Sequence, residues 1–339
     1  MTAGPANVLV SEPAFAHTAV IVDSEHVLRA VLVPHLRRSL QARQPVVMVV
    51  GEHITSVVRD ELGTDPAGLE WADPTRFYQR LGFAYEQFRR YLAAQHAAGR
   101  RVHVVAEPEI MGEVDADAST DRAAAYLAYE SVCNETYAPY GSPVTCVWDS
   151  RRHAAEVIEG ARSVHSHELT AAGRRRNPAY VRTDDFLAGR ANAPFDEPPT
   201  SVDHDLTLVD ATQLSSLRAV LLSWVGEHSF GSLAGEDVVL AITEVATNGL
   251  THGSAPIRVR GWRQGSALVT QVDDRGGRPL PPDAGYRPPA AVHTPGGRGL
   301  WLARQLADTV TTYTSNGRTS VRLHFPREII NRLTDATPS

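Results

Sequence analysis

Glu244 and Asn248 are the two residues of this 339-residue sequence whose types and spacing best suit chemistry on a phosphate group. They lie four positions apart in LAITEVATNGLTHG, and Val238, Ile242 and Val245 recur at helical spacing, which predicts a buried stripe beside them. An amide oxygen suits Mg²⁺, and a carboxylate one turn earlier can accept the proton of an attacking hydroxyl group. For this pair alone, a solvated helix face is an equally good interpretation.

A glycine-containing segment, VDDRGGRPLPP, follows the predicted helix. An apolar strand ends there in Asp273 and Asp274, and Gly276 and Gly277 come directly after them. An aspartate at a strand end can accept a hydrogen bond from an exocyclic amine such as that of adenine, and glycine lets a ring approach the backbone. The pattern by itself is also an ordinary turn. We assign base recognition to Asp274, with Asp273 as the competing candidate.

A second glycine-containing segment, PGGRGLWLARQLAD, starts a predicted helix about twenty residues later. Free N–H groups at a helix start can bind phosphate, and an arginine there can pair with a phosphate oxygen. An exposed arginine near a helix start is also common without any ligand. The candidate nucleotide contacts in this segment are Gly297, Arg298, Gly299 and Leu300.

The three segments, in this order, resemble the GHKL ATPase superfamily over about residues 204 to 327, and their short spacing is most similar to the anti-sigma-factor serine kinases. The resemblance implies an α+β two-layer sandwich of the GHKL (Bergerat) type that binds ATP and Mg²⁺. It also implies that Glu244 is the catalytic base, Asn248 the Mg²⁺ ligand and Asp274 the adenine contact. The sequence departs from the family by having Asp274-Arg275-Gly276-Gly277 in place of a DxGxG box, and by a short lid over 279–296.

The family suggests an anti-sigma factor that sequesters a sigma factor and phosphorylates a serine or threonine of a STAS-type anti-anti-sigma protein. A non-catalytic nucleotide-binding module that regulates by partner exchange is the alternative, and the shortened first box favours it. We find no histidine in a dimerisation helix before this region, which disfavours a histidine kinase. The resemblance alone suggests a homodimer.

The first half of the sequence alternates predicted strands with predicted helices, which is typical of an α/β domain with a mostly parallel sheet. Apolar runs at 45–50, 101–105 and 143–148 predict strands, and 74–98 predicts a helix. GEHIT after the first of these runs lacks the second glycine and the lysine of a P-loop. We therefore expect a RecA-like parallel sheet without a P-loop.

Scattered residues over about 12–170 resemble the MEDS sensory domain, from AFAHTAVIVDSEHVL through AYLAYESVCNETY to PVTCVWDS. That resemblance implies a small-molecule signal, and open α/β sheets place ligand pockets at strand ends and helix starts. The residue types leave a metal at His17, Cys146 and His165 open, alongside ordinary roles in a core. The candidate sensory residues are His17, Glu107, Glu130, Cys146, Asp149 and His165.

Length and composition predict two domains of a globular protein. We expect a sensory domain at 1–182, a linker at 183–203 that is rich in Pro and Asp, the ATPase domain at 204–330 and a tail at 331–339. The net charge of −6 and the lack of a long basic face argue against direct binding of nucleic acid. No signal peptide or long apolar run is evident, so a cytoplasmic protein without membrane contact is expected.

Overall fold

The apolar runs of the first half of the chain form a seven-stranded sheet in the computed structural model, in the order β3-β2-β4-β5-β1-β6-β7. All neighbouring strands are parallel except β6 and β7, which pair antiparallel. The structure describes residues 15–74, 80–108, 116–194, 196–289 and 298–327. The strands are β1 His17–Val22, β2 Val46–Val49, β3 Leu69–Trp71, β4 His103–Ala106, β5 Val144–Asp149, β6 His167–Thr170 and β7 Gly173–Arg176.

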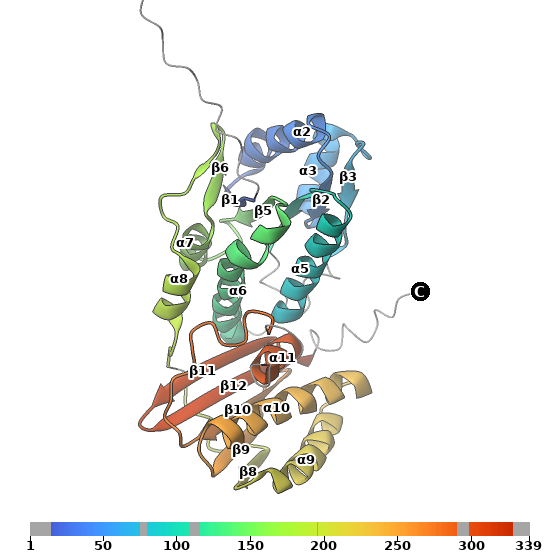
Figure 1. The fold of residues 1–339 in the computed structure, drawn as a ribbon. Coiled ribbons are helices and arrows are strands. Elements are labelled where there is room, and N and C mark those ends of the chain that lie inside the picture. The colour runs from blue at the N-terminus through green and yellow to red at the C-terminus, as the bar shows by residue number, and fades with distance from the viewer. Residues whose placement is uncertain (1–14, 75–79, 109–115, 195, 290–297, 328–339) are drawn as a thin grey trace, which may run out of the picture.

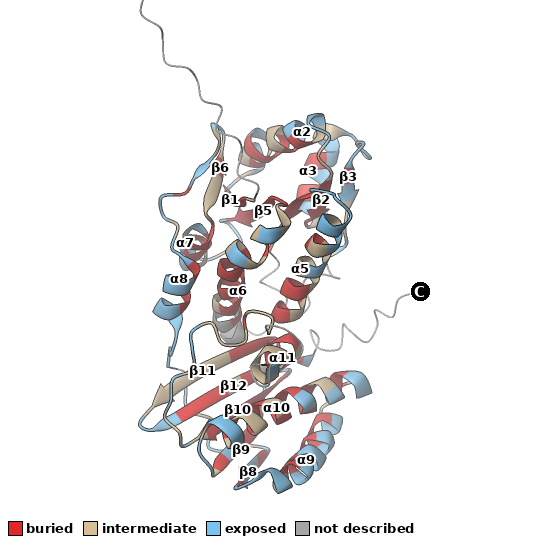
Figure 2. Cartoon of the chain, in the orientation of Figure 1, coloured by how far each residue is buried: buried red, intermediate tan, exposed pale blue. Residues whose placement is uncertain are grey.

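Helices cover both faces of this sheet, which explains why its central strands are buried throughout (Figure 2). One face packs against η1 (Leu28–Leu32), α2 (Val33–Gln41) and α3 (Glu52–Leu62). The other face packs against α5, α6 and α7, and α8 packs on α6 and α7. Their bounds are α5 Leu81–Ala97, α6 Ala116–Thr136, α7 Ala155–Val164 and α8 Thr183–Arg190, and the short elements are α1 Glu25–Val27 and η2 Ala138–Tyr140. The predicted mostly parallel α/β sheet is confirmed, and its RecA-like character stays a prediction.

The second half of the chain forms a five-stranded antiparallel sheet in the order β11-β12-β10-β9-β8, with helices packed on it (Figure 1). Alternating residues of the strands, such as Leu268 and Val272, meet the apolar stripe of α10 in one core. The predicted layered α+β arrangement is confirmed. The elements are β8 His204–Leu208, η3 Ala211–Gln213, α9 Leu214–Glu227, α10 Ser232–His252, β9 Ile257–Gln264, β10 Ala267–Asp274, α11 Arg298–Leu306, β11 Thr309–Ser315 and β12 Arg318–Pro326.

The segment assigned to a linker, 183–203, begins with helix α8, although its sequence shows no helical period. Phe186 and Leu187 are buried against the sensory half, and the Thr183 hydroxyl group donates to the carbonyl oxygen of Ser131 in α6 at 2.8 Å. A pair of adjacent apolar residues does not produce a helical period. Tertiary packing, which the sequence pattern does not display, therefore stabilises this helix.

The two domains contact each other where α5 and α6 meet α11 and β11 (Figure 1). Arg122 of α6 donates from Nε to both carboxylate oxygens of Asp308 at 3.1 and 2.9 Å, and both side chains are buried. Arg80 donates to the Asp237 carboxylate at 2.8 Å and to the Leu306 carbonyl oxygen at 2.9 Å. Paired, buried charges of this kind fix the orientation of two surfaces because separating them leaves charges without partners.

Aromatic and backbone contacts extend this interface. Tyr286, from the segment between the two glycine-containing segments, belongs to the hydrophobic cluster of the amino-terminal domain. Its ring lies 5.1 Å from that of Tyr129 in α6, and the Arg304 guanidinium lies 3.9 Å over it. At Gly82 in α5, a Cβ atom would lie only 2.1 Å from the Arg304 carbonyl oxygen. The start of α5 therefore packs directly on the backbone of α11.

No helix in the described ranges is long and apolar enough to cross a membrane.

Candidate functional site

A cavity of about 410 Å³ lies in the carboxy-terminal domain between α10, β10, the turn at 278–285 and the start of α11. The walls are mostly apolar, and a few polar side chains interrupt them. The lining residues are Val245, Asn248, Gly249, His252, Gly253, Val272, Asp274, Arg278, Pro279, Leu280, Ala284, Gly285, Gly299, Leu300, Thr319 and Val321. Four sequence-predicted residues, Asn248, Asp274, Gly299 and Leu300, thus border one cavity.

Glu244 and Asn248 lie one turn apart on α10, as their spacing requires, and both face the start of α11. A Cβ atom on Gly299 would lie 2.8 Å from Asn248 Nδ2 and 2.9 Å from Glu244 Oε2. A side chain at position 299 would displace the ends of the Asn248 and Glu244 side chains, so glycine permits this approach. Arg298 begins α11, and Gly297 lies outside the described residues. The structure therefore brings the first and third sequence motifs into contact distance.

Asp273 and Asp274 point to opposite faces of the sheet because successive side chains of a strand alternate. Asp273 is buried on the far face, where it accepts from Arg260 at 2.6 Å and from Gln271 at 2.8 Å. Asp274 lines the cavity, and its Oδ1 accepts the backbone N–H of Gly276 at 2.6 Å. The structure thus separates the two candidates, and only Asp274 faces the cavity.

Burial raises the pKa of Asp274, and hydrogen bonds from the backbone N–H groups of Gly276 and Ser254 partly offset that rise. Gly276 and Gly253 make room for this carboxylate, since a Cβ atom on Gly253 would lie 2.5 Å from Asp274 Cγ, and one on Gly276 would lie 2.7 Å from Oδ1. A carboxylate held this way still has acceptor capacity for a ligand in a mostly apolar environment.

Sequence reasoning missed the residues that close this cavity from the lid side. Gly285 has a φ of +76°, and a Cβ atom there would lie 2.9 Å from the Leu300 carbonyl oxygen, so the turn packs tightly on the start of α11. Leu280 and Thr319 complete the walls. The run of Pro and Gly around 279–285 was the available signal, because it marks a turn with special backbone geometry.

A second polar site lies inside the amino-terminal domain, where four buried side chains converge. Both His17 Nε2 and His165 Nε2 lie 3.1 Å from Glu130 Oε2. Cys146 Sγ lies 3.5 Å from the same oxygen and 3.6 Å from His17 Nε2. We call His17, Glu130, Cys146 and His165 the four-ligand cluster, since their candidate metal-binding atoms all lie within 4.8 Å of one another.

Different elements supply the members of the four-ligand cluster. His17 starts β1, and Cys146 lies in the adjacent parallel strand β5, where it pairs with Ala19, so both side chains point to the same face of the sheet. Glu130 comes from α6, which covers that face, and His165 follows α7. Glu130 and Cys146 lie inside their elements, so the expectation that all candidates stand at strand ends or helix starts was wrong for these two.

Glu107 and Asp149 do not join this cluster. Glu107 follows β4, accepts the backbone N–H of Gly51 at 2.8 Å and pairs with Arg152 at 2.9 Å. Asp149 ends β5 and pairs with Arg151 at 2.6 Å, which lowers the pKa of its carboxyl group. These carboxylates lie at the carboxyl ends of the parallel strands, whereas His17 lies at an amino end. The positions of these residues along the sequence do not reveal that Glu107 and Asp149 lie apart from the four-ligand cluster.

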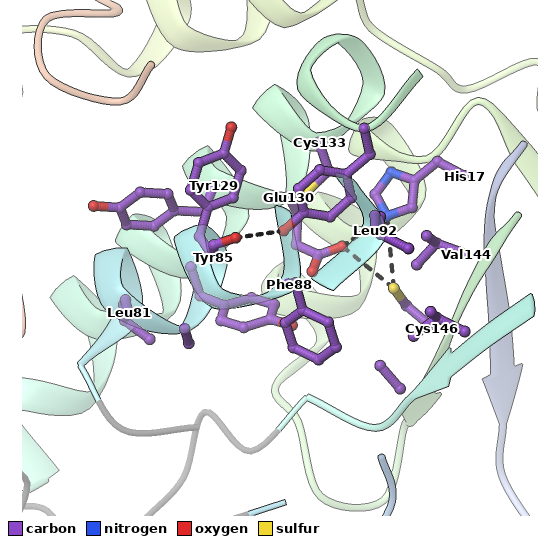
Figure 3. Close-up of a pocket in the computed structure, with 15 residues that line it drawn as sticks. His17, Leu81, Tyr85, Phe88, Leu92, Tyr129, Glu130, Cys133, Val144 and Cys146 are labelled. Atoms are coloured by element: carbon purple, nitrogen blue, oxygen red, sulfur yellow. Dashed lines mark hydrogen bonds and ion pairs between the residues drawn. The ribbon is translucent and has the colours of Figure 1, made fainter. Parts of the chain in front are cut away.

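A small cavity of about 50 Å³ adjoins the four-ligand cluster, and aromatic side chains form much of its wall. His17, Glu130 and Cys146 lie together at one end of it, and Leu81 and Tyr129 lie at the other (Figure 3). Tyr85 and Phe88 of α5 also line it, which the sequence reasoning did not foresee. A water molecule needs about 10–15 Å³ of such volume, so a molecule of only a few non-hydrogen atoms fits.

Comparisons with known families agree with this division into two sites. Residues 16–166 match the family model described as MEthanogen/methylotroph, DcmR Sensory domain (MEDS), and residues 208–325 match that of the histidine kinase-like ATPase domain. The chain joins a MEDS domain to a histidine kinase-like ATPase domain. Both resemblances predicted from the sequence are thereby confirmed at the level of the domain family.

Solved structures resemble the chain only loosely. The RsbU and RsbW domains of a Mycobacterium tuberculosis protein match with 22% identity and a TM-score of 0.27, over 36% of this chain and 32% of that one. This chain therefore spans about a third of that structure's length. The histidine kinase domain of a blue-light activated kinase from Erythrobacter litoralis matches with 13% identity and a TM-score of 0.26, over 75% of this chain and 99% of that one. No curated protein sequence matches the chain.

Within this frame, the larger cavity belongs to the ATPase domain, and the four-ligand cluster with its small cavity belongs to the MEDS domain. The two sites are linked through the interface, because Tyr129 lines the MEDS cavity and contacts Tyr286. Gly285, the neighbour of Tyr286, lines the ATPase cavity.

Proposed function

We propose that this chain is a sensor-regulated partner-switching protein whose ATPase domain binds Mg·ATP and phosphorylates a serine or threonine of a STAS-type anti-anti-sigma protein. In its other state it holds a sigma factor. One observation carries the proposal: Asn248, Gly299 and Asp274 line one cavity, and the Glu244 carboxylate lies next to Gly299 beside Asn248. A nucleotide site requires a residue that recognises the purine ring and groups that face the phosphates, both in one cavity.

The apolar part of the cavity suits a purine base. Val245, Val272 and Leu280 supply apolar walls, and Asp274 supplies an acceptor for an exocyclic amine. The rise in the pKa of Asp274 through burial indicates a carboxyl group with restricted access to water. A hydrogen bond there distinguishes adenine, which carries an exocyclic amine at this edge, from a base that carries an oxygen.

The other part of the cavity suits the phosphates and Mg²⁺. Asn248 and Gly299 line the cavity side by side, and an amide oxygen belongs to the donors that Mg²⁺ prefers. Asn248 would hold the ion, which supplies charge neutralisation on the phosphates when bound. The N–H groups at the start of α11 and the Arg298 side chain would bind phosphate oxygens. Glu244 would accept the proton of the attacking serine or threonine hydroxyl group.

Exposed apolar side chains on the ATPase domain support a protein partner. Leu233 and Leu240 lie two turns apart on α10 and are 61% and 42% exposed, and Leu222 of α9 is 52% exposed. Large apolar side chains on a surface commonly mark protein-binding sites when they gather. Helix α10, which carries Leu233 and Leu240, also lines the nucleotide cavity, so partner binding on this helix and nucleotide state can influence each other.

The MEDS domain would bias this exchange through the interface. Leu81 and Tyr85 of α5 line the sensory cavity, and the start of the same helix contacts α11 at Gly82. A signal that binds unequally to two arrangements of α5 and α11 shifts the population of nucleotide-binding states, and nucleotide shifts signal affinity by the same factor.

In the non-catalytic alternative, the protein binds ATP but does not transfer its phosphate to a partner. The shortened Asp274-Arg275-Gly276-Gly277 box favours this alternative. The first experiment measures ATP affinity by calorimetry with and without Mg²⁺. The second incubates the protein with labelled ATP, Mg²⁺ and candidate STAS-type proteins. Binding with transfer supports the kinase, binding without transfer to any candidate supports the alternative, and no binding refutes both.

Three variants make this test specific. Asn248→Ala is expected to remove the Mg²⁺ dependence of ATP binding, and Glu244→Gln is expected to keep binding but lose transfer by about 10²-fold or more. Glu236→Gln is the matched control, because Glu236 is an exposed carboxylate two turns earlier on the same helix. If Glu236→Gln loses transfer as strongly as Glu244→Gln, the assignment of the base is wrong.

A further inference from the structure

The four-ligand cluster of the MEDS domain has the donor set and the spacing of a metal site. We propose that His17, Glu130, Cys146 and His165 bind one divalent transition-metal ion of the zinc class, at a site separate from the nucleotide cavity. The donors are two imidazole nitrogens, one carboxylate oxygen and one sulfur, and all four residues are buried. Imidazole and thiolate together select zinc-like ions over Mg²⁺ or Ca²⁺.

The distances between the donors fit one ion at their centre. Zinc bonds to nitrogen and oxygen of about 2.0–2.2 Å and to sulfur of about 2.3 Å place the ligands of a tetrahedron about 3.3–3.8 Å apart. The measured pairs around Glu130 Oε2 and His17 Nε2 span 3.1 to 3.6 Å. No candidate pair exceeds 4.8 Å, so closure around an ion needs only small side-chain adjustments.

The hydrogen bond on the far side of His165 orients its ring for an ion. His165 Nδ1 lies 2.7 Å from the Ala161 carbonyl oxygen, and because a carbonyl group only accepts, Nδ1 carries the hydrogen. In the neutral ring, Nε2 then presents a lone pair to the cluster, where it makes no hydrogen bond with any described residue. Metal-binding histidines are typically fixed in this way by a carbonyl group behind the ring.

Charge balance also favours an ion. His165 Nε2 and Glu130 Oε2 would otherwise be two lone-pair atoms facing each other at 3.1 Å inside the core. A divalent ion with one thiolate, one carboxylate and two neutral imidazoles carries no net charge, which suits a buried site. A cluster without metal must instead place an extra proton between Glu130 and His165, beside a second imidazole ring whose centroid lies 4.0 Å from that of His165.

The four-ligand cluster borders the small cavity of the sensory domain. Three of its members, His17, Glu130 and Cys146, line that cavity, so a bound ion would face the space that is proposed to receive the signal molecule (Figure 3).

The test measures metal in the full chain. We expect protein purified from zinc-supplemented culture to carry one zinc per chain, and the Co²⁺-substituted protein to give a thiolate-to-cobalt charge-transfer band with intense tetrahedral d–d bands. Cys146→Ser is expected to abolish the charge-transfer band and to weaken zinc binding by more than about 100-fold against a chromophoric chelator, since even outer hydrogen-bond partners are worth 10–100-fold.

Cys133→Ala is the matched control, because Cys133 is the other buried cysteine, lines the same cavity and lies outside the four-ligand cluster. It must keep the zinc and the cobalt band. Folded wild-type protein without stoichiometric zinc and without a cobalt band overturns the proposal, as does a band that disappears in Cys133→Ala but persists in Cys146→Ser. If Cys146→Ser does not fold, the wild-type spectrum and the Cys133→Ala control still decide.

Discussion

Gly82→Ala tests whether the two domains pack on each other in solution as they do in the structure. Gly82 lies in the first turn of α5, where its backbone touches α11. A new Cβ atom would lie 2.1 Å from the Arg304 carbonyl oxygen and 2.7 Å from the Tyr129 hydroxyl oxygen. A carbon-to-oxygen contact needs about 3.3 Å. Because the first contact is with backbone, α5 and α11 must separate by about 1 Å.

Two opposing effects determine how far Gly82→Ala changes the free energy of unfolding. Alanine in a helix is favoured over glycine by about 0.5–1 kcal/mol, which stabilises the variant. Overpacking of a tight interface costs about 1–3 kcal/mol. The separation also lengthens the nearby hydrogen bond from Arg80 to the Leu306 carbonyl oxygen, now 2.9 Å, at about 1 kcal/mol. The net expectation is destabilisation by about 1–3 kcal/mol.

The assay is thermal and urea unfolding followed by calorimetry and fluorescence. We expect Gly82→Ala to lower the midpoint of thermal and urea unfolding. We also expect the single unfolding transition to split into two, because the domains then unfold separately. Gly226→Ala is the control: Gly226 lies in helix α9, and a Cβ atom there has nothing within 4 Å, so only the helix preference acts. A Gly82→Ala protein as stable as Gly226→Ala would refute the interface.

Three further predictions address other parts of the structure. Gly299→Ala places a methyl group against the ends of two side chains, so we expect unchanged unfolding but about tenfold weaker ATP binding in calorimetry, and unchanged affinity would contradict the proposed site. Asp308→Ala breaks the buried pair with Arg122 and should cost about 3–5 kcal/mol in urea unfolding, most of it recovered when Arg122→Met is added. The pKa of His103 is lowered well below 6.5 by burial and by nearby His35, so the folded form stays neutral while the unfolded chain takes up a proton. Unfolding free energy should therefore be constant above about pH 7 and fall below about pH 6.5, by at most about 1.4 kcal/mol per pH unit from this group, and His103→Asn should flatten that slope.

The ATPase cavity could be predicted from the sequence because its parts follow local rules. Helical spacing places Glu244 and Asn248 on one face of α10, and the order of the glycine-containing segments indicated the superfamily. The choice of Asp274 over Asp273 could also have been made from the sequence. Leu268 and Val272 face the helix-covered core, and the alternation of a strand carries that face on to Asp274.

The sensory cluster could not be assembled in the same way. Its members lie at positions 17, 130, 146 and 165, and what joins them is the parallel register of β1 with β5 and the docking of α6. Neither the register nor the docking leaves a pattern in the sequence. Glu107 and Asp149 have equally suitable side chains and yet lie at the other end of the strands. Helix α8 was missed for a related reason, since Phe186 and Leu187 are stabilised by contacts with the sensory half.

The placement of Tyr286 has a kinetic meaning. Its ring is held by the MEDS domain, and the next residue back, Gly285, borders the cavity of the ATPase domain. If the cavity binds nucleotide as proposed, movement of the Gly285 segment during nucleotide exchange would disturb the contact between the Tyr286 and Tyr129 rings, whose centroids lie 5.1 Å apart. The sensory domain would then influence how long the nucleotide stays bound, and not only how tightly it binds.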